Sequence, residues 1–305
     1  MFPGRGAALT KILDIDEISL LGMVPTPFTE GGQWIDETSL NRMAQTLVSR
    51  GCSGLVALGV VAEPESLSVA EQIQIVGVLA EAVPTTPLVA TLMAVEPSGH
   101  DAATAQILSE VGRHLDGVMV PVTSSDAREF RELLRRTYDL SGLPVIVQDF
   151  PAPTGITITA RALAEAVDGL DFVASIRCQA LPTFYKMQQL RRLTAVPLMS
   201  GFGGVGLVDE LLAGATAVAC GITRPEVIAA ALHSWNEGNI AQARQLTADL
   251  SPLINYETQP STSIGIRKEH WRLQGVIENA DVRPPTIPYQ ESFRTLSALH
   301  GFTGS

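Results

Sequence analysis

Eight short apolar segments, each followed by an amphipathic stretch, constrain the fold of this chain more than any other feature. Segments such as Gly54-Leu-Val-Ala-Leu-Gly59 and Pro144-Val-Ile-Val147 show no alternation of apolar and polar residues. Unbroken apolar strands are typical of a parallel sheet that is covered on both faces, so we expect buried parallel strands. The segments begin near Ser19, Gly54, Pro87, Asp116, Pro144, Asp171, Pro197 and Thr216.

The stretches between these segments carry the marks of helices. Leu40, Met43 and Leu47 fall on one helical stripe. The start signals are the capping-box pattern Ser68-Val-Ala-Glu71, the N-cap candidates Asp126 and Thr159, and Pro225 in a first helical turn. Eight strand–helix units in succession favour one (β/α)8 TIM barrel over two doubly wound halves.

The length of 305 residues suits a single α/β barrel with additional elements. We assign residues 1–18 to an N-terminal segment, 19–238 to the barrel and 239–305 to a C-terminal helical appendage. The helical pattern of the appendage is expected to break at its prolines. These are Pro252, Pro260, Pro284 and Pro285.

Composition excludes several classes of protein. The net charge is −11, which argues against nucleic acid as a partner because phosphate contacts need a basic face. No apolar run approaches the roughly 18 residues of a membrane span, and no secretory signal is visible, so we expect a cytoplasmic protein without membrane contact. Three dispersed cysteines, and five histidines without ligand spacing, predict neither a disulfide framework nor a metal site, and we assign no cofactor.

A TIM barrel carries its functional residues at the C-terminal ends of its strands. One loop in such a position, Gly201-Phe-Gly203-Gly-Val-Gly206, matches the pattern G-x-G-x-x-G. A dinucleotide-binding fold would place this pattern after its first strand, which disfavours that interpretation. In a barrel the loop either binds phosphate through backbone N–H groups or is a flexible turn.

Several motifs at these strand ends resemble the dihydrodipicolinate synthase/N-acetylneuraminate lyase family of class I aldolase-like barrels. The similar segments are Gly22-Met-Val-Pro-Thr-Pro-Phe28, Gly59-Val-Val-Ala-Glu63 in place of Gly-Thr-Thr-Gly-Glu, Gln148-Asp-Phe-Pro151 in place of Tyr-Asn-x-Pro, and Ser175-Ile-Arg177 in place of Gly-Ile-Lys. The resemblance extends over about residues 19–300. It implies a lyase that acts on pyruvate-like 2-keto acids and assembles as a homo-oligomer, a dimer or a tetramer.

The resemblance also implies that Arg177 stands at the position of the imine-forming lysine. A guanidinium stays protonated and its nitrogens are delocalised, so it cannot attack a carbonyl as an amine does. The family's proton-relaying tyrosine is replaced by Gln148, and its two loop threonines by Val60 and Val61. We therefore expect no imine chemistry. The lysines of the chain are Lys11, Lys186 and Lys268, and none ends a strand.

We take Arg177, Gln148 and Asp149 as the catalytic candidates. Arg177 either binds an anionic substrate through its guanidinium fork or forms an ion pair with Glu63 or Asp149. Asp149 either accepts a proton, if burial raises its pKa, or orders the turn after it. Gln148 is expected to hydrogen-bond a ligand or Arg177.

The substrate-binding candidates are Thr26, Val60, Val61, Glu63, Gly201 and Gly203. Two functions remain open. The first is a lyase relative in which Arg177 polarises a small carboxylate electrostatically. The second is a catalytically silent barrel that binds a small anion, a carboxylate or a phosphate, in a regulatory or structural role. A polar pocket beside Arg177 would favour a functional site, whereas filling by Val60, Val61 and Phe150 would not.

Overall fold

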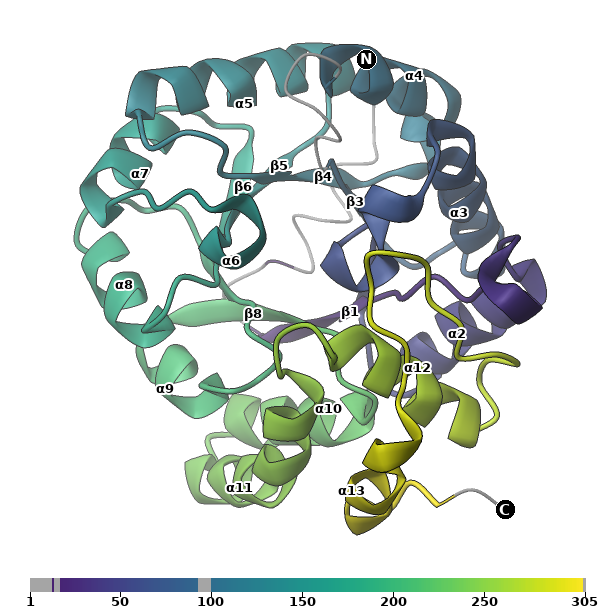
Figure 1. The fold of residues 1–305 in the computed structure, drawn as a ribbon. Coiled ribbons are helices and arrows are strands. Elements are labelled where there is room, and N and C mark those ends of the chain that lie inside the picture. The colour runs from purple at the N-terminus through teal and green to yellow at the C-terminus, as the bar shows by residue number, and fades with distance from the viewer. Residues whose placement is uncertain (1–12, 14–16, 93–99, 304–305) are drawn as a thin grey trace.

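Eight parallel strands close into a barrel in sequence order in the computed structural model of the protein (Figure 1), which describes Leu13 and residues 17–92 and 100–303. The strands are β1 (Ser19–Met23), β2 (Gly54–Ala57), β3 (Leu88–Thr91), β4 (Gly117–Pro121), β5 (Val145–Asp149), β6 (Val173–Cys178), β7 (Leu198–Ser200) and β8 (Ala215–Cys220). Each begins within two residues of its predicted start. The predicted TIM barrel is confirmed.

A ring of helices covers the outside of the barrel (Figure 1). They are α2 (Glu37–Ser49), α3 (Val69–Ala82), α4 (His100–Val111), α5 (Ala127–Ser141), α7 (Ala160–Val167), α8 (Thr183–Leu190), α9 (Leu207–Leu212) and α10 (Pro225–Asn236). Short helical turns are η1 (Glu30–Gly32), η2 (Val60–Ala62), η3 (Pro64–Ser66), η4 (Gly112–His114) and α6 (Pro151–Thr154).

The predicted start signals form. The Ser68 hydroxyl accepts from the Glu71 backbone N–H at 3.3 Å, and the Glu71 carboxylate accepts from the Ser68 N–H at 2.8 Å. Asp126 and Thr159 cap α5 and α7 through their side chains, and Pro225 opens α10. These local bonds satisfy N–H groups that the helices leave without a partner at their N-termini, so the sequence places the helix starts correctly.

Alternation along the strands separates an inner from an outer core. Side chains such as Leu21, Met119 and Ile146 fill the barrel interior. Their neighbours on the strands, such as Val147 and Cys178, pack outward against the helices. Because successive strand residues point to opposite faces, this pattern also fixes which polar side chains reach the mouth of the barrel.

The C-terminal region contains α11 (Ile240–Glu257), α12 (Ser263–Leu273), η5 (Glu291–Phe293) and α13 (Arg294–Leu299). α12 and the segment after it lie near β1 and α2 (Figure 1). The predicted break at Pro252 is wrong, because α11 continues through this proline. A proline inside a helix costs about 3 kcal/mol, and packing of α11 against α10 offsets that cost. No helix in the described residues is long and apolar enough to cross a membrane.

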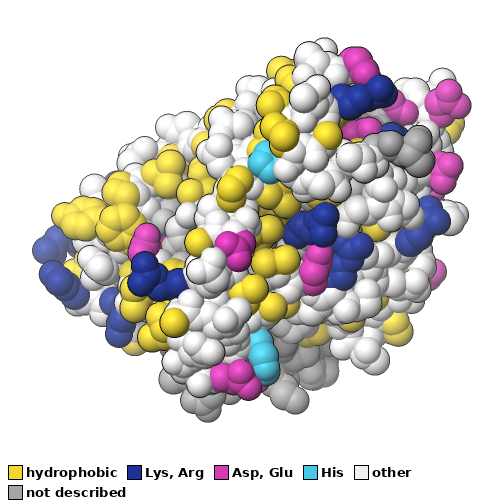
Figure 2. Space-filling view, turned by 90° about the horizontal axis from the view of Figure 1, so that it is seen from below, with side chains coloured by type: hydrophobic (Ala, Val, Ile, Leu, Met, Phe, Trp, Pro, Cys, Tyr) yellow, Lys and Arg dark blue, Asp and Glu magenta, His cyan; other side chains and the backbone are white. Residues whose placement is uncertain are grey.

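Large apolar side chains are exposed at the start of α8. Leu181, Phe184 and Tyr185 are 66%, 41% and 54% exposed. Figure 2 shows hydrophobic side chains gathered on the left of the molecule, the side on which α8 and α9 lie in Figure 1. Contiguous exposed apolar surface is typical of a contact face between proteins.

Candidate functional site

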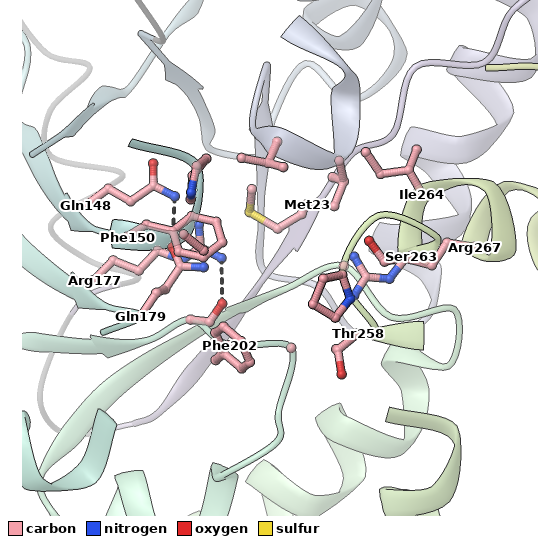
Figure 3. A pocket seen from close by; sticks show the side chains of 18 of the residues that line it. Met23, Gln148, Phe150, Arg177, Gln179, Phe202, Thr258, Ser263, Ile264 and Arg267 are labelled. Atoms are coloured by element: carbon pink, nitrogen blue, oxygen red, sulfur yellow. Dashed lines mark hydrogen bonds between the residues drawn. The ribbon is translucent and has the colours of Figure 1, made fainter. Parts of the chain in front are cut away.

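A cavity of about 280 Å³ opens at the C-terminal ends of the strands (Figure 3). Its walls come from both the barrel loops and the C-terminal region. Six of the nine predicted site residues line it, namely Gln148, Arg177, Val60, Val61, Gly201 and Gly203. The other three, Thr26, Glu63 and Asp149, do not. The valines and Phe150 form part of the wall without filling the pocket.

Arg177 reaches the cavity from β6 and is only 3% exposed. Its Nη2 donates to the carbonyl oxygens of Gly201 and Ala219, at 3.0 Å each. Its Nε is buried and has no hydrogen-bond partner among the described residues. Burial lowers the pKa of Arg177 to about 10, because removing water disfavours the charged form.

Gly201 permits this placement of Arg177. A Cβ atom at Gly201 would lie 2.7 Å from Arg177 Nε and 2.7 Å from Gln179 Cγ. Carbon atoms do not approach other heavy atoms this closely without displacing them. The close backbone approach therefore requires glycine, and it also brings the Gly201 carbonyl within reach of the guanidinium.

Neither carboxylate expected to pair with Arg177 does so. Asp149 points outward from β5 and is fully buried, with its Oδ2 2.5 Å from Lys186 Nζ on α8. Burial raises the pKa of Asp149, and the nearby Lys186 opposes that shift. Asp149 does not line the cavity, so its placement gives no support to a catalytic role for this carboxylate.

Glu63 is the second carboxylate, and Lys268 of α12 binds it in a buried ion pair. The Arg283 backbone N–H donates to Glu63 Oε2 at 2.9 Å. Lys268 Nζ also lies 4.2 Å from the centre of the Phe28 ring. Burial lowers the pKa of Lys268 to about 8, although Glu63 opposes the shift. Glu63 therefore ties the loop after β2 to the C-terminal region.

A third carboxylate, Glu210 of α9, acts on Arg177 electrostatically without forming an ion pair with it. The hydroxyls of Ser200 and Thr183 bind its two oxygens. Burial raises the pKa of Glu210, which favours its neutral form. Within the described residues, Arg177 thus has no carboxylate at ion-pair distance.

Two glutamines lie beside Arg177. Gln148 Nε2 donates to Gln179 Oε1 at 2.8 Å, and Gln148 Oε1 is buried without a hydrogen-bond partner in the described chain. Gln148 and Arg177 are neighbours in the β5–β6 register. Sequence reasoning missed Gln179. Its signal was available, because it follows Arg177 by two residues and so points to the same face.

The loop after β2 contributes Val60 and Val61 to the cavity wall. Val60 and Val61 are the first two residues of η2, where N–H groups lack an intrahelical acceptor. The Thr26 hydroxyl donates to the Ala62 carbonyl at 2.9 Å and is fully buried. Thr26 thus stabilises the loop after β2 without lining the cavity.

The glycine loop after β7 belongs to a barrel, and the closed sheet rules out the dinucleotide-binding interpretation. Gly201 and Gly203 line the cavity. Gly203 has a φ of +65°, and a Cβ there would lie 2.7 Å from Thr258 Cγ2. Glycine is therefore needed at this position for both conformation and space.

Arg267 is a cavity residue that the sequence analysis did not anticipate. It lies on α12, is 8% exposed, and has a buried Nε without a hydrogen-bond partner in the described part of the chain. Burial lowers the pKa of Arg267, and Glu257 opposes the shift. Figure 3 shows Arg267 and Arg177 on opposite sides of the cavity, with Met23 between them. Arg267 does not follow a predicted strand, so the strand-end criterion did not select it.

Among the described residues, Arg177 and Arg267 are the only ionisable side chains that line the cavity. Other polar groups there are amides and hydroxyls, such as Gln179 and Ser263. No group of three or more His, Cys, Asp or Glu side chains in the described residues could hold a metal ion. The arrangement is therefore suited to binding an anion, and it offers no carboxylate or imidazole for proton transfer from this wall.

Comparison with known proteins identifies the family of the barrel. The model of the Dihydrodipicolinate synthetase family matches residues 17–298. The chain belongs to this family. An L-2-keto-3-deoxyarabonate dehydratase from Azospirillum brasilense is 26% identical over 270 residues, 86% of each chain. A 4-hydroxy-tetrahydrodipicolinate synthase from Mycolicibacterium paratuberculosis is 27% identical over 278 residues, 88% of this chain and 89% of that relative.

Solved structures of dihydrodipicolinate synthases share the fold. The enzyme from Rhodopseudomonas palustris aligns with a TM-score of 0.84 at 20% identity, covering 93% of this chain and 97% of the other. The enzyme from Bacillus anthracis aligns with a TM-score of 0.84 at 19% identity, covering 96% and 100%. The family predicted from the strand-end motifs is confirmed.

In this member of the dihydrodipicolinate synthetase family, the two described lysines are kept away from the cavity. Lys186 forms an ion pair with Asp149 on the outer side of β5, and Lys268 forms an ion pair with Glu63, next to η2. Neither lines the cavity. Lys11 lies outside the described residues.

Proposed function

We propose that the barrel mouth binds a small carboxylate, a 2-keto acid or a close relative, through Arg177 and without forming an imine. The observation that carries the proposal is a buried guanidinium that has no carboxylate at ion-pair distance among the described residues. Asp149, Glu63 and Glu210 are each bound to other groups. An anionic ligand is the partner that remains.

The energetics support a ligand at this place. An unpaired buried charge costs several kcal/mol, so such charges are normally paired. The carbonyls of Gly201 and Ala219 compensate Arg177 in part, but its Nε–H has no acceptor among the described residues. A carboxylate oxygen would supply that acceptor as a charge-assisted hydrogen bond. The apolar wall of Met23 and Val61 suits the carbon skeleton of such a ligand.

A lyase reaction is the second candidate, and family membership favours it. The dehydratase relative is named for a keto acid, and Arg177 could polarise the bound carbonyl or carboxylate of a similar ligand. Such a reaction also needs a group that moves a proton. The described cavity wall holds arginines, amides and hydroxyls, so binding is supported more directly than turnover.

Calorimetry with an Arg177→Met variant tests the proposal, using pyruvate, citrate and phosphate as probes. We expect roughly ten- to a hundredfold weaker binding of the anions that the unmodified protein binds, since a charge-assisted hydrogen bond contributes about 1.5–3 kcal/mol. Arg294→Met is the matched control, because Arg294 is an exposed arginine paired with Glu291. Unchanged anion affinity in Arg177→Met would make Arg177 a structural residue and the proposal wrong.

We also propose that the chain assembles as a homo-oligomer, a dimer or a tetramer, as its family resemblance implies. The exposed apolar side chains at the start of α8 support this, because burial against a second copy would remove them from water. Leu181 and Tyr185 are the residues to test there.

A further inference from the structure

We infer that the ligand of the barrel mouth carries two negatively charged groups, one bound by Arg177 and the other by Arg267. The inference rests on the proposed function and adds the class of ligand: a short organic dianion, a dicarboxylate in its simplest form. It also makes Arg267 a specificity-determining residue supplied by the C-terminal region.

Arg267 meets the same physical conditions as Arg177. Both guanidiniums are more than nine-tenths buried, both line the cavity, and both have a buried Nε without a hydrogen-bond partner among the described residues. One monocarboxylate at Arg177 would leave the charge of Arg267 uncompensated. Two such charges facing one cavity therefore favour a ligand with two anionic groups.

The carboxylate that influences Arg267 is engaged elsewhere. Glu257 accepts from the Thr223 backbone N–H at 2.9 Å and lies 2.6 Å from His270 Nδ1. In the described residues no carboxylate lies within ion-pair distance of Arg267. The chain as a whole has a net charge of −11, opposite in sign to the two cavity arginines.

Apolar side chains border the space between the arginines. A Cβ at Gly221 would lie 3.6 Å from Arg267 Nη1, 3.2 Å from Met23 Cβ and 3.4 Å from Val61 Cγ1, so Arg267 borders this wall directly. Figure 3 shows Met23 between the two arginines. A ligand spanning them would place a carbon chain against Met23 and Val61 and an anionic group at each end.

The cavity has room for a short organic dianion. About 280 Å³ corresponds to the volume of roughly nine water molecules. A dicarboxylate with four to six carbons has a similar number of non-hydrogen atoms. The unpaired Oε1 of Gln148 lies at the Arg177 side and would accept from a hydroxyl group on the ligand.

Glutarate and its monomethyl ester test the inference, because the two have a similar chain and differ by one charge. Binding is measured by calorimetry on the full chain and on the variants Arg267→Met, Arg267→Lys and Arg294→Met. We expect the unmodified protein to bind glutarate roughly ten- to a hundredfold more tightly than the ester. Arg267→Met should abolish this preference and leave ester affinity within about twofold. Arg267→Lys should retain part of the preference, and Arg294→Met all of it.

The possible failures are distinguishable. If glutarate and the ester bind equally to the unmodified protein, or if Arg267→Met keeps the preference, the inference is wrong, whereas Arg177-dependent binding of pyruvate would still support the proposed function. If none of the anions binds, or if Arg177→Met changes no affinity, the proposed function fails and the inference fails with it. Arg267→Lys keeps a cation on α12, so it remains informative if Arg267→Met does not fold.

Discussion

Asp149 Oδ2 lies 2.5 Å from Lys186 Nζ, on the outer side of β5, away from the cavity that Gln148 of the same strand lines. Lys186 also donates to the Ile158 carbonyl at 2.7 Å, so the pair is anchored between the barrel and its helices. This single contact removes both a candidate base and a candidate partner of Arg177 from the mouth. It leaves the site with two arginines that have no carboxylate at ion-pair distance in the described chain.

Replacing Asp149 should affect stability and leave anion binding unchanged. Asp149→Asn removes the partner of the buried Lys186, and breaking a buried ion pair costs about 3–5 kcal/mol. Urea denaturation measures the loss, and calorimetry with pyruvate measures binding. The double variant Asp149→Asn/Lys186→Met is the control and should recover part of the lost stability. A large loss of anion affinity with normal stability would instead give Asp149 a direct role in the site.

Replacing Gly201 should disturb Arg177. The Cβ of Gly201→Ala would lie 2.7 Å from Arg177 Nε, so the guanidinium or the loop has to move. We expect a loss of about 1–3 kcal/mol in stability, typical of overpacking, together with weaker anion binding. Gly77→Ala on α3 is the matched control, because no neighbouring atom lies within 4 Å of its Cβ. Unchanged binding in Gly201→Ala would show that the exact position of Arg177 does not matter for the ligand.

Anion binding should decline in alkaline solution. Burial lowers the pKa of Arg177 to about 10, so the free protein loses this positive charge as the pH rises through that value. We expect nearly constant affinity for pyruvate from about pH 7 to 9 and a fall above about pH 10. Stability should change in the opposite direction. The pKa of Arg177 is lower in the folded than in the unfolded protein, so burying its charge destabilises the fold at neutral pH. This cost is relieved as the pH rises above about 10.

Calorimetry across this pH range, with circular dichroism to verify folding, gives the test. Arg294→Met serves as a reference for titration elsewhere on the surface, since Arg294 is exposed. Affinity that stays constant through about pH 10.5 in folded protein would contradict a role for the Arg177 charge.

Pyruvate should form no imine with this protein. Incubation with pyruvate and borohydride, followed by mass spectrometry of the intact chain, should give no adduct, because Lys186 and Lys268 are held in buried ion pairs and do not line the cavity. Arg177→Lys is the informative control. A buried amine has a lowered pKa and is a better nucleophile, so this variant should trap pyruvate if the cavity orients it. An adduct on any lysine of the unmodified chain would overturn the prediction.

The assembly proposal is tested at the start of α8. We expect light scattering at micromolar concentration to give a mass above that of one chain. Leu181→Glu places a charge on an exposed apolar surface and should shift the equilibrium toward smaller species without loss of fold. Leu140→Glu on α5 is the control, since Leu140 is 48% exposed and lies on another helix. A monomer for the unmodified chain would contradict the proposal.

The barrel and several residues of its mouth could be predicted from local patterns in the chain. Strand positions, the caps at Ser68 and Asp126, and the presence of Gln148 and Arg177 at strand ends depend on periodicity and on neighbours within a few residues. Such signals are local, so they can be recognised without knowing the fold. Alternation likewise places Gln179 on the same face as Arg177, although Gln179 was not among the predicted site residues.

Which charged side chains form pairs depends on long-range packing. Lys186 and Lys268 come from helices to bind Asp149 and Glu63, and Arg267 enters the cavity from α12. These contacts join residues far apart in the chain, and no local pattern encodes a distance between them. The continuation of α11 through Pro252 also depends on long-range packing, because contact with α10 outweighs the tendency of the proline to break the helix. The charge balance of the site is thus a property of the packed barrel and its C-terminal helices.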